Sequence, residues 1–381
     1  MALSDYITPI YKGLDIFDHQ LVGFIPAIPV DGRVSRLAKG KTMNVFKADV
    51  GDVVDYSASM NFTDTDGDDT KMGSVPVEIE EVKTVTVSLD GEEEEGVKQS
   101  IDYDSLMTQR FYKAFSKLRN YIEAYLANKC VIGASRATGT IGTVPFGTAG
   151  DLSDMAALAR ILDDNGADID NRQLILNSAS LESLRGKMNN LFKANEKGDD
   201  SFLRSGYLNI PLEGFNIWSS AGLKTHTAGA GSGYALSAAA TENATSISVD
   251  TGTGTILAGD FITLAGDTNK YVVNTGITAP GAIEIGTPGL MAAAADNTVV
   301  TKGAAYLPNV ALRPDAIAFG ARAPYLYGGK DAGEHRIVQD PISKLPFDIA
   351  LYYGHGKARM EVSIAYGAKV TDSNNIALLI Q

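Results

Sequence analysis

The stretch IDYDSLMTQRFYKAFSKLRNYIEAYLANKCVI, residues 101–132, decides the fold of this chain. It contains neither proline nor glycine, and its apolar residues recur every three or four positions, which is the period of one helix face. At 1.5 Å per residue the predicted helix is about 45 Å long, whereas most globular helices are about a quarter to a half of that length. Asp102 or Asp104 can cap its N-terminus, and Gly133 can end it. We therefore expect a spine against which a flat layer packs. Its apolar stripe comprises Tyr103, Leu106, Met107, Phe111, Ala114, Phe115, Leu118, Tyr121, Ile122, Tyr125 and Leu126.

Composition favours a large soluble protein that does not bind nucleic acid on its own. The chain has 381 residues, enough for two or three domains with a large core. Its formal net charge is −13 and its sequence pI about 4.8, whereas a free-standing nucleic-acid-binding protein normally carries a basic face. The single cysteine, Cys130, cannot form an intramolecular disulfide, and we interpret it as a small buried apolar residue.

Targeting signals are not evident in the sequence. The N-terminal residues MALSDYITPIYKG lack a basic region followed by an apolar stretch, so we expect no signal peptide. No apolar run approaches the ~20 residues of a membrane-spanning helix, so we expect no membrane partner. We therefore expect a protein that is made and used in the cytoplasm.

Residues 1–40 have the composition of an arm that lies on another surface. Short apolar groups alternate with Pro9, Pro26 and Pro29, so this segment cannot build a core of its own. It is nevertheless too apolar for a disordered tail. One short helix is expected near residues 15–22.

Residues 41–76 are expected to form a long extended loop with an acidic tip. Residues 42–48 alternate like a strand. A calcium-binding loop is one interpretation of the tip, because aspartates at alternate positions supply hard oxygen ligands. The EF-hand pattern fails, however, since its sixth position is Asp69 instead of glycine and its twelfth is Val75 instead of glutamate. We therefore prefer a solvated tip and predict no metal site. The acidic residues of the tip are Asp64, Asp66, Asp68 and Asp69.

Two layers of mixed structure are expected next. Residues 77–80 and 83–89 alternate as strands, and the acidic run 92–95 is expected to be a charged turn before the long helix. The glycine-rich linker 139–150 does not end in the Gly-Lys-Ser/Thr of a phosphate-binding loop. A compact α/β module then follows. Its predicted elements are a helix at 153–165, a strand at 173–177, a helix at 181–191 and a strand at 214–218.

From about residue 225 to 304 the composition changes to mostly Gly, Ala, Thr, Ser and Val. Six short alternating strands separated by turn residues predict a small β-barrel or sandwich. It carries few ionisable side chains, so we interpret it as a structural or interaction module. Strands after it must close sheets that began before it, so the module is an insertion. The six strands are predicted at 234–236, 246–249, 261–264, 270–273, 282–285 and 298–301, and the later ones at 310–319, 349–354, 360–367 and 375–380.

Recognisable catalytic motifs are missing from the sequence. None of the four histidines pairs with another histidine or a cysteine at metal-ligand spacing. No Gly-x-Ser-x-Gly elbow and no dinucleotide-binding glycine set is found. We therefore predict no catalytic, cofactor-binding or metal-binding residues, although catalytic residues need only be adjacent in space. The parts as a whole indicate a protein that assembles.

The order of these parts resembles that of the tailed-phage major capsid proteins, most closely the short-tailed Salmonella-phage type, which carries an inserted β-barrel. The resemblance implies an α+β major capsid fold of the tailed-phage and herpesvirus type. In this fold the chain divides into an N-terminal arm (1–40), an extended loop (41–76), a peripheral domain with the spine helix (77–149), an axial domain (150–223 and 306–348), the inserted barrel (224–305) and C-terminal peripheral strands (349–381). The residues that carry it lie at 215–217, 225–229, 244–250, 255–266 and 309–319.

The resemblance also implies a function. Copies of the chain would assemble as pentamers and hexamers into an icosahedral shell around double-stranded phage DNA, located in the virion and made in the host bacterial cytoplasm. Its partners would be a scaffolding protein, a portal protein and the packaged DNA, without sequence-specific binding. Asp15 and Asp18 are the candidates for scaffold contact, and the acidic tip at 64–69 is the candidate for contact between subunits.

Two other functions stay open at this point. The first is a virion surface or decoration protein that uses the barrel as a binding module. It requires an exposed aromatic platform, for which Tyr234, Phe261, Tyr271 and Tyr306 are available. The second is an enzyme with a carboxylate site, which would show a deep pocket with facing Asp or Glu side chains.

Overall fold

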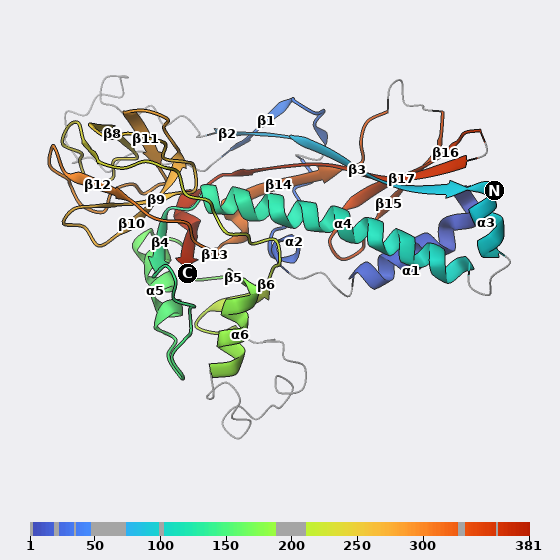
Figure 1. Ribbon diagram of the computed structural model, residues 1–381, viewed down its shortest axis with the longest axis horizontal. Coiled ribbons are helices and arrows are strands. Elements are labelled where there is room, and N and C mark those ends of the chain that lie inside the picture. The colour runs from blue at the N-terminus through green and yellow to red at the C-terminus, as the bar shows by residue number, and fades with distance from the viewer. Residues whose placement is uncertain are drawn as a thin grey trace, which may run out of the picture.

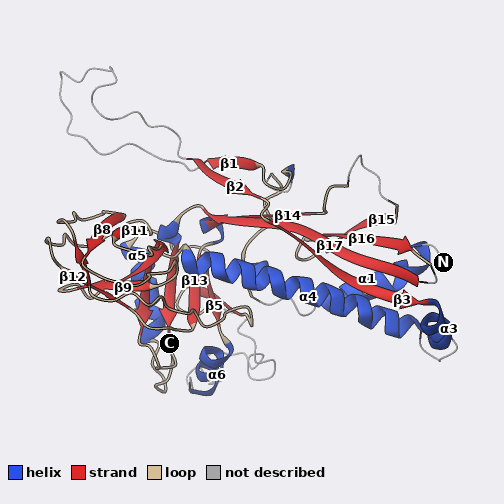
Figure 2. Ribbon diagram, turned by 45° about the horizontal axis from the view of Figure 1, so that its top comes forward, coloured by secondary structure: helices blue, strands red, loops and turns tan. Residues whose placement is uncertain are grey.

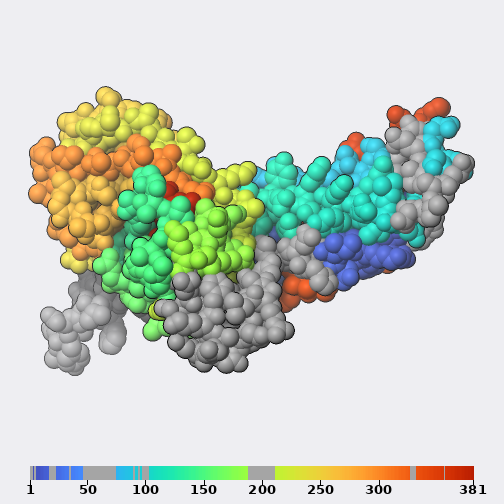
Figure 3. Space-filling view, turned by 60° about the horizontal axis from the view of Figure 1, so that its bottom comes forward, coloured from blue at the N-terminus to red at the C-terminus, as the bar shows by residue number. Residues whose placement is uncertain are grey.

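The computed structural model shows an elongated molecule (Figure 1). One long helix and a twisted sheet form a narrow arm, and a second sheet with a β-barrel forms the broader end. Figure 3 shows the same division from another side, with the barrel (gold and orange) at one end and the long helix running along the arm. The structure describes residues 3–18, 23–33, 36–46, 74–98, 103–187, 211–326, 332–355 and 357–381.

The predicted spine is helix α4 (Tyr103–Ile132). Phe111 and Phe115 on its apolar face are fully buried, and the Phe115 ring packs against Phe347 with centroids 5.0 Å apart. The helix ends before Gly133, where an added Cβ would lie 2.4 Å from Cγ2 of Val370. The length and the boundaries of the helix agree with the prediction, and Cys130 is buried as expected. The apolar stripe agrees except at Tyr121, which is 58% exposed.

A sheet of five antiparallel strands lies along α4 (Figure 2). We call it the peripheral sheet. The long strand β17 is its centre, with β3 on one side and β14 and β16 on the other, and β15 forms an edge beside β16. Its strands are β3 (Glu81–Asp90), β14 (Ile317–Arg322), β15 (Glu334–Gln339), β16 (Pro346–Tyr353) and β17 (Lys357–Val370).

The N-terminal arm packs onto the spine, as its apolar composition predicts. It forms a 3-10 turn at Leu3–Tyr6 and helices α1 (Ile7–Asp18) and α2 (Phe24–Ala27). Gly13 allows α1 to approach α4 closely, because an added Cβ there would lie 3.1 Å from the carbonyl oxygen of Thr108. Helix α1 begins at Ile7, whereas the sequence predicted a short helix near residues 15–22.

The acidic run 92–95 is part of a helix, α3 (Gly91–Lys98), and the predicted charged turn is wrong. Glutamate is a good helix former, and a carboxylate near a helix N-terminus interacts favourably with the positive end of the helix dipole. The density of like charge therefore did not prevent a helix.

The axial sheet has five strands in the order β4-β18-β13-β5-β6. The pairs β18–β4 and β5–β6 are parallel, whereas β13 runs antiparallel to both of its neighbours. Helices α5 (Ser153–Asp164) and α6 (Ser178–Lys187) accompany this sheet. Its strands are β4 (Arg136–Gly139), β5 (Arg172–Leu176), β6 (Phe215–Ser219), β13 (Pro308–Leu312) and β18 (Ile376–Ile380).

The inserted module is a closed six-stranded barrel, as predicted. The strands follow the cycle β11-β8-β7-β12-β9-β10, and the pairing of β10 with β11 closes it. The barrel has an apolar core of its own, and β10 also pairs with β4 of the axial sheet. Its strands are β7 (Tyr234–Leu236), β8 (Ser246–Asp250), β9 (Phe261–Leu264), β10 (Lys270–Thr275), β11 (Gly281–Ile285) and β12 (Val299–Lys302).

A separate two-stranded ladder stands away from the body in Figure 2. Strands β1 (Thr42–Phe46) and β2 (Ser74–Glu78) pair antiparallel, which agrees with the strand expected at 42–48. The predicted acidic tip falls within residues 47–73, outside the described residues.

Hydrogen-bonded pairs cross several of the predicted domain boundaries. Strand β4, expected in the peripheral domain, pairs with β18 and β10, and β18, expected among the peripheral strands, lies in the axial sheet. Strands β14 and β15, expected in the axial domain, belong to the peripheral sheet. The single strand predicted at 310–319 is two strands in different sheets, separated by a turn at Pro314–Ala316. Alternation identifies a strand, but it does not identify the sheet that the strand joins.

Candidate functional site

The sequence-predicted contact residues lie mostly beyond what the structure describes. Asp15 is exposed on α1, and Asp18 ends that helix, with a side chain outside the described residues. The predicted inter-subunit residues Asp64, Asp66, Asp68 and Asp69 also lie outside the described residues. Both assignments therefore stay predictions. What the structure does show is how its parts are fastened together.

Glu123 joins the N-terminal arm, the spine and the axial sheet. Glu123 is 4% exposed and lies within the buried face of α4. It accepts hydrogen bonds from the backbone N–H groups of Phe24 and Ile25, both at 2.9 Å, and from Oγ of Ser220 at 2.7 Å. Burial raises the pKa of Glu123, although these hydrogen bonds oppose the shift. A buried carboxylate is tolerated here because several donors satisfy it.

Two glycines make room for this junction. At Gly23, where φ is 114°, an added Cβ would lie 2.5 Å from Oε2 of Glu123. At Gly222 an added Cβ would lie 2.9 Å from the carbonyl carbon of Glu123. A left-handed backbone and close backbone approach are both positions that glycine occupies without steric cost. The arm and the axial segment can therefore reach the same point of the helix.

Glu80 fastens the spine to the peripheral sheet. Its carboxylate accepts hydrogen bonds from the Tyr125 hydroxyl and from Nζ of Lys129, each at 2.8 Å. The Tyr125 oxygen in turn accepts the backbone N–H of Ala368, at 3.0 Å. Burial raises the pKa of the Tyr125 hydroxyl, so it stays a donor at neutral pH. The polar network ties α4 to β17 where the helix approaches the axial sheet.

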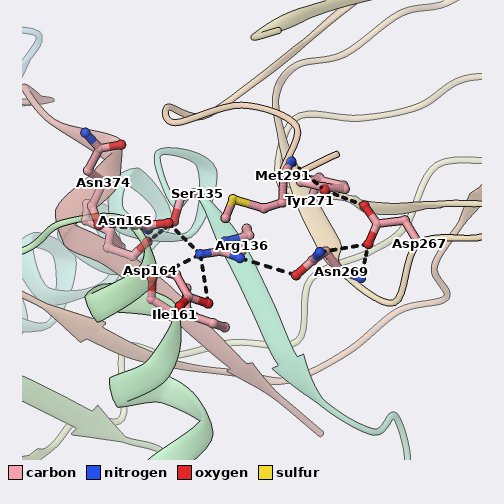
Figure 4. Close-up of polar contacts among 11 residues, drawn as sticks. Ser135, Arg136, Ile161, Asp164, Asn165, Asp267, Asn269, Tyr271, Met291 and Asn374 are labelled. Atoms are coloured by element: carbon pink, nitrogen blue, oxygen red, sulfur yellow. Dashed lines mark hydrogen bonds and ion pairs between the residues drawn. The ribbon is translucent and has the colours of Figure 1, made fainter. Parts of the chain in front are cut away.

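Arg136 of β4 lies in the seam between the axial sheet and the barrel (Figure 4). Its side chain is 3% exposed. One guanidinium nitrogen donates to the carbonyl oxygen of Ile161, at 3.1 Å, and to Oδ1 of Asn165, at 2.7 Å. The other donates across the seam to Oδ1 of Asn269, at 3.3 Å. Burial lowers the pKa of Arg136, and the nearby Asp164 carboxylate opposes this.

On the barrel side of the seam, Asp267 organises the loop before β10. Its carboxylate accepts hydrogen bonds from the backbone and side-chain amides of Asn269, at 2.9 and 2.7 Å, and from the Tyr271 hydroxyl. The Tyr271 oxygen accepts the backbone N–H of Met291 at 2.9 Å. Figure 4 shows this chain of contacts continuing from the Arg136 cluster. The barrel is therefore connected to the axial sheet by side chains as well as by β10.

A His–Asp pair lies where the chain enters the barrel. Nε2 of His226 lies 2.8 Å from Oδ1 of Asp260, whose side chain is fully buried. Asp260 also accepts the backbone N–H groups of Leu257, at 2.8 Å, and Gly229, at 3.1 Å. Burial raises the pKa of Asp260, but these hydrogen bonds and the His226 ring outweigh it and leave the pKa below its usual value. The Tyr306 ring packs against His226 with centroids 5.3 Å apart.

Neither a catalytic pocket nor a metal cluster is evident in the described part of the chain. A groove of about 780 Å³ separates residues 29–33 from the axial segment 165–168. Two carboxylates of this groove, Asp168 and Asp315, do not form a facing acid pair. Arg313 lies between them and forms an ion pair with each. Within the described residues, no three His, Cys, Asp or Glu side chains are grouped closely enough to hold a metal ion. The helices of these same residues include none that is long and apolar enough to span a membrane.

Sequence reasoning missed Glu123 and Arg136, two buried polar residues that join separate elements. Glu123 falls between the apolar positions of the predicted helix, so the three-four spacing does not place it on the buried face. Arg136 stands in a short strand next to a glycine-rich linker, where a lone arginine carries no signal. The available sign in the sequence was that Glu123 has apolar neighbours on both sides in the same helix turn.

Comparisons with known proteins match this chain in fold and not in sequence. No family model matches it, and no curated protein matches it. A structure from Mycobacterium phage Che8 matches 94% of this chain and 91% of its own, at a TM-score of 0.51 and 15% identity. The capsid structure of cyanophage P-SCSP1u covers 94% and 88%, at a TM-score of 0.49 and 12% identity. The capsid asymmetric unit of cyanophage A-1(L) covers 94% and 93%, at a TM-score of 0.48 and 12% identity.

The Che8 match leaves out only a small part of either chain, so it concerns the fold as a whole. The chain thus has the fold of the tailed-phage major capsid proteins, with a small closed β-barrel inserted in it.

Proposed function

We propose that this chain is the major capsid protein of a tailed phage, and that its copies form the icosahedral shell around double-stranded DNA. The observation that carries the proposal is the fold shared with the Che8 structure over 94% of the chain. The net charge of −13 supports a shell into which DNA is pumped by a motor, because an acidic coat has little attraction for DNA phosphates.

Exposed apolar side chains on α4 and the peripheral sheet support repeated contacts between copies. Tyr121 of α4, Ile337 of β15 and Tyr353 of β16 are 58%, 64% and 58% exposed. Large apolar and aromatic side chains are enriched at protein interfaces. Such contacts are weak singly, but a shell repeats them in every subunit and so allows reversible assembly.

Within this proposal the partners are further copies of the chain as pentamers and hexamers, a scaffolding protein, a portal protein and packaged DNA. Asp15 and Asp18 are proposed to contact the scaffold, and the tip residues 64–69 to contact a neighbouring subunit. The protein would be made in the host bacterial cytoplasm and reside in the virion. The inserted barrel supports the short-tailed Salmonella-phage type as the nearest kind of coat protein.

The structure does not provide the aromatic surface that a decoration protein with a binding barrel would need. It needs an exposed aromatic platform, yet the four available rings are all buried, at 6% exposure or less. No described feature of the barrel surface favours a ligand in their place. These rings are Tyr234, Phe261, Tyr271 and Tyr306.

Imaging tests the proposal directly. The purified chain, expressed with and without the scaffolding gene of its phage, is viewed by negative-stain electron microscopy. Closed shells of uniform diameter are expected with the scaffold. Small discrete oligomers under both conditions would contradict the proposal. They would favour the alternative function, in which the barrel is a binding module.

A further inference from the structure

The turn between β15 and β16, residues 340–345, presents an exposed apolar side chain on a fixed backbone. We call it the hairpin turn. Ile342 lies in it and is 62% exposed. The carboxylate of Asp340, a fully buried residue, accepts the backbone N–H groups of Ile342, at 3.3 Å, and of Ser343, at 3.0 Å, and also the Ser343 hydroxyl. The backbone N–H of Asp340 donates to the carbonyl oxygen of Leu345, at 3.0 Å. Because the turn is held in one conformation, binding a partner through Ile342 costs little conformational entropy.

Lys344 places a cation in the same turn. Its φ is 58°, in the left-handed region, where a side chain other than glycine is strained. The residue is exposed, and its ammonium group forms no ion pair with the described residues. A strained position that holds an unpaired cation indicates a role for that cation outside its own subunit.

The groove of about 780 Å³ between residues 29–33 and the axial segment is complementary to this turn. Apolar residues, including Val30, Ile317 and Phe319, form part of its lining. Arg313 is shared by two carboxylates, Asp168 at 2.5 Å and Asp315 at 3.1 Å, whose side chains are 77% and 57% exposed. The groove therefore combines apolar contacts with an excess of negative charge. Its four carboxylates belong to Asp31, Asp168, Asp315 and Asp372, and its two guanidinium groups to Arg33 and Arg313.

The walls of the groove come from three parts of the chain that are already joined. The backbone N–H of Asp31, in the arm, donates to the carbonyl oxygen of Phe319 in β14, at 2.6 Å. The backbone N–H of Arg313 donates to the carbonyl oxygen of Asn375, at 3.0 Å, which ties the axial segment to the turn before β18. A groove with fixed walls can bind an element without rearranging.

Within one subunit the hairpin turn does not fill the groove. None of the residues that line the groove belongs to the turn. Strand β14 lies between them along β17, with Ile317 opposite Val370 at the groove end and Arg322 opposite Ala365 at the other end. The five residue steps between Ile317 and Arg322 cover about 17 Å at roughly 3.3 Å each. A contact between turn and groove therefore needs a second molecule.

We propose that the hairpin turn of one copy docks in this groove of a second copy. Ile342 enters against the apolar lining, and Lys344 pairs with Asp168 and Asp315. The inference rests on the proposed shell, and it names a contact between copies that does not involve the extended loop. Because the arm, the axial segment and the peripheral sheet all line the groove, a docked turn would hold the three in fixed relative positions.

Introduced cysteines test the contact directly. The native Cys130 is buried, so a thiol reagent reaches only the introduced positions. Assembled Ile342→Cys/Asp168→Cys protein, treated with a short bis-maleimide crosslinker, is expected to give a ladder of covalent oligomers on a denaturing gel. The control Ile342→Cys/Glu182→Cys, with its second cysteine at an exposed position of α6, is expected to stay monomeric. Monomers from both pairs would overturn the proposal, as would crosslinks from the turn to the scaffolding protein in place of a second copy.

Charge exchange supplies a second test. Lys344→Glu and Asp168→Lys are each expected to lower the yield of closed shells about threefold, and their combination to restore it to within about twofold of the unchanged protein. Lys187→Glu, at another exposed lysine, is expected to keep the yield. Absence of recovery in the combination would overturn the proposed pairing.

Lys344→Gly separates docking from folding. Glycine suits the left-handed backbone, so the melting temperature of the subunit is expected to stay within about 2 °C, while the shell yield still falls about threefold. An unchanged yield would overturn the role of the Lys344 cation. Failure of the unchanged protein to form shells would count against the proposed function, whereas crosslinking of concentrated subunits would still decide whether the turn docks in the groove.

Discussion

Oε2 of Glu123, in the middle of the spine helix, lies 2.9 Å from the backbone nitrogen of Phe24 in the N-terminal arm. The two residues are separated by 99 positions in the sequence, and the contact is buried. A carboxylate in the apolar face of a helix is costly unless donors reach it. Here the donors are the first N–H groups of α2 and a serine of the axial segment, so position of the arm and ionisation of the carboxylate depend on each other.

Replacing Glu123 with alanine should lower the free energy of unfolding by about 2–4 kcal/mol, because buried donors at Phe24, Ile25 and Ser220 lose their acceptor. Urea denaturation of unassembled subunits measures this. Glu182→Ala, at an exposed position of α6, is the matched control and should change stability by less than about 0.5 kcal/mol. Equal stability of both variants would show that the junction is not needed for the fold.

Asp260 should make the barrel sensitive to acid. The pKa of Asp260 is lowered in the folded state, so its contribution to stability is present above its usual, unfolded-state pKa of about 3.9 and is lost as pH falls through the lower folded pKa. Thermal unfolding of the intact chain, followed from about pH 7 down to about pH 2, should show a steeper loss of stability in acid than the Asp260→Asn variant shows. Parallel curves for the two proteins would exclude this role of Asp260.

Arg136→Met should loosen the seam between the axial sheet and the barrel. The acceptors on Ile161, Asn165 and Asn269 lose their shared donor, and we expect a loss of about 2–3 kcal/mol in unfolding free energy. Hydrogen exchange should rise in β4 and β10, where the two sheets join. Arg160→Met, at an exposed position of α5, is the control. Faster exchange spread evenly over both variants would argue against a seam-specific effect.

Gly133→Ala should destabilise the end of the spine helix by about 1–3 kcal/mol, because the new Cβ would overlap the Val370 side chain. The double variant Gly133→Ala/Val370→Ala should recover part of that loss. A double-mutant cycle of urea unfolding measures the coupling between the two positions. Strict additivity of the two single effects would mean that the clash is relieved elsewhere.

Local patterns in the sequence were enough to predict the spine helix and all six barrel strands. Each of these elements has a clear period of its own, and the barrel strands mostly pair with one another along a short stretch of chain. Sheet membership was predicted poorly for β4, β14 and β18, because their partners are distant in sequence and a strand has the same alternation in either sheet. The polar junctions were missed for a related reason. Glu123 and Arg136 are satisfied by backbone groups and side chains from other elements, and backbone donors leave no trace in residue type.

The two ends of the inserted barrel meet at a single bridge, where the backbone N–H of His226 donates to the carbonyl oxygen of Tyr306 at 2.8 Å. The chain can therefore leave for the barrel and return from it at one point, because the entry and exit residues are neighbours. The same geometry offers a grafting point. A foreign domain whose termini lie close together could replace the barrel between these residues, and in the proposed shell every copy would carry it.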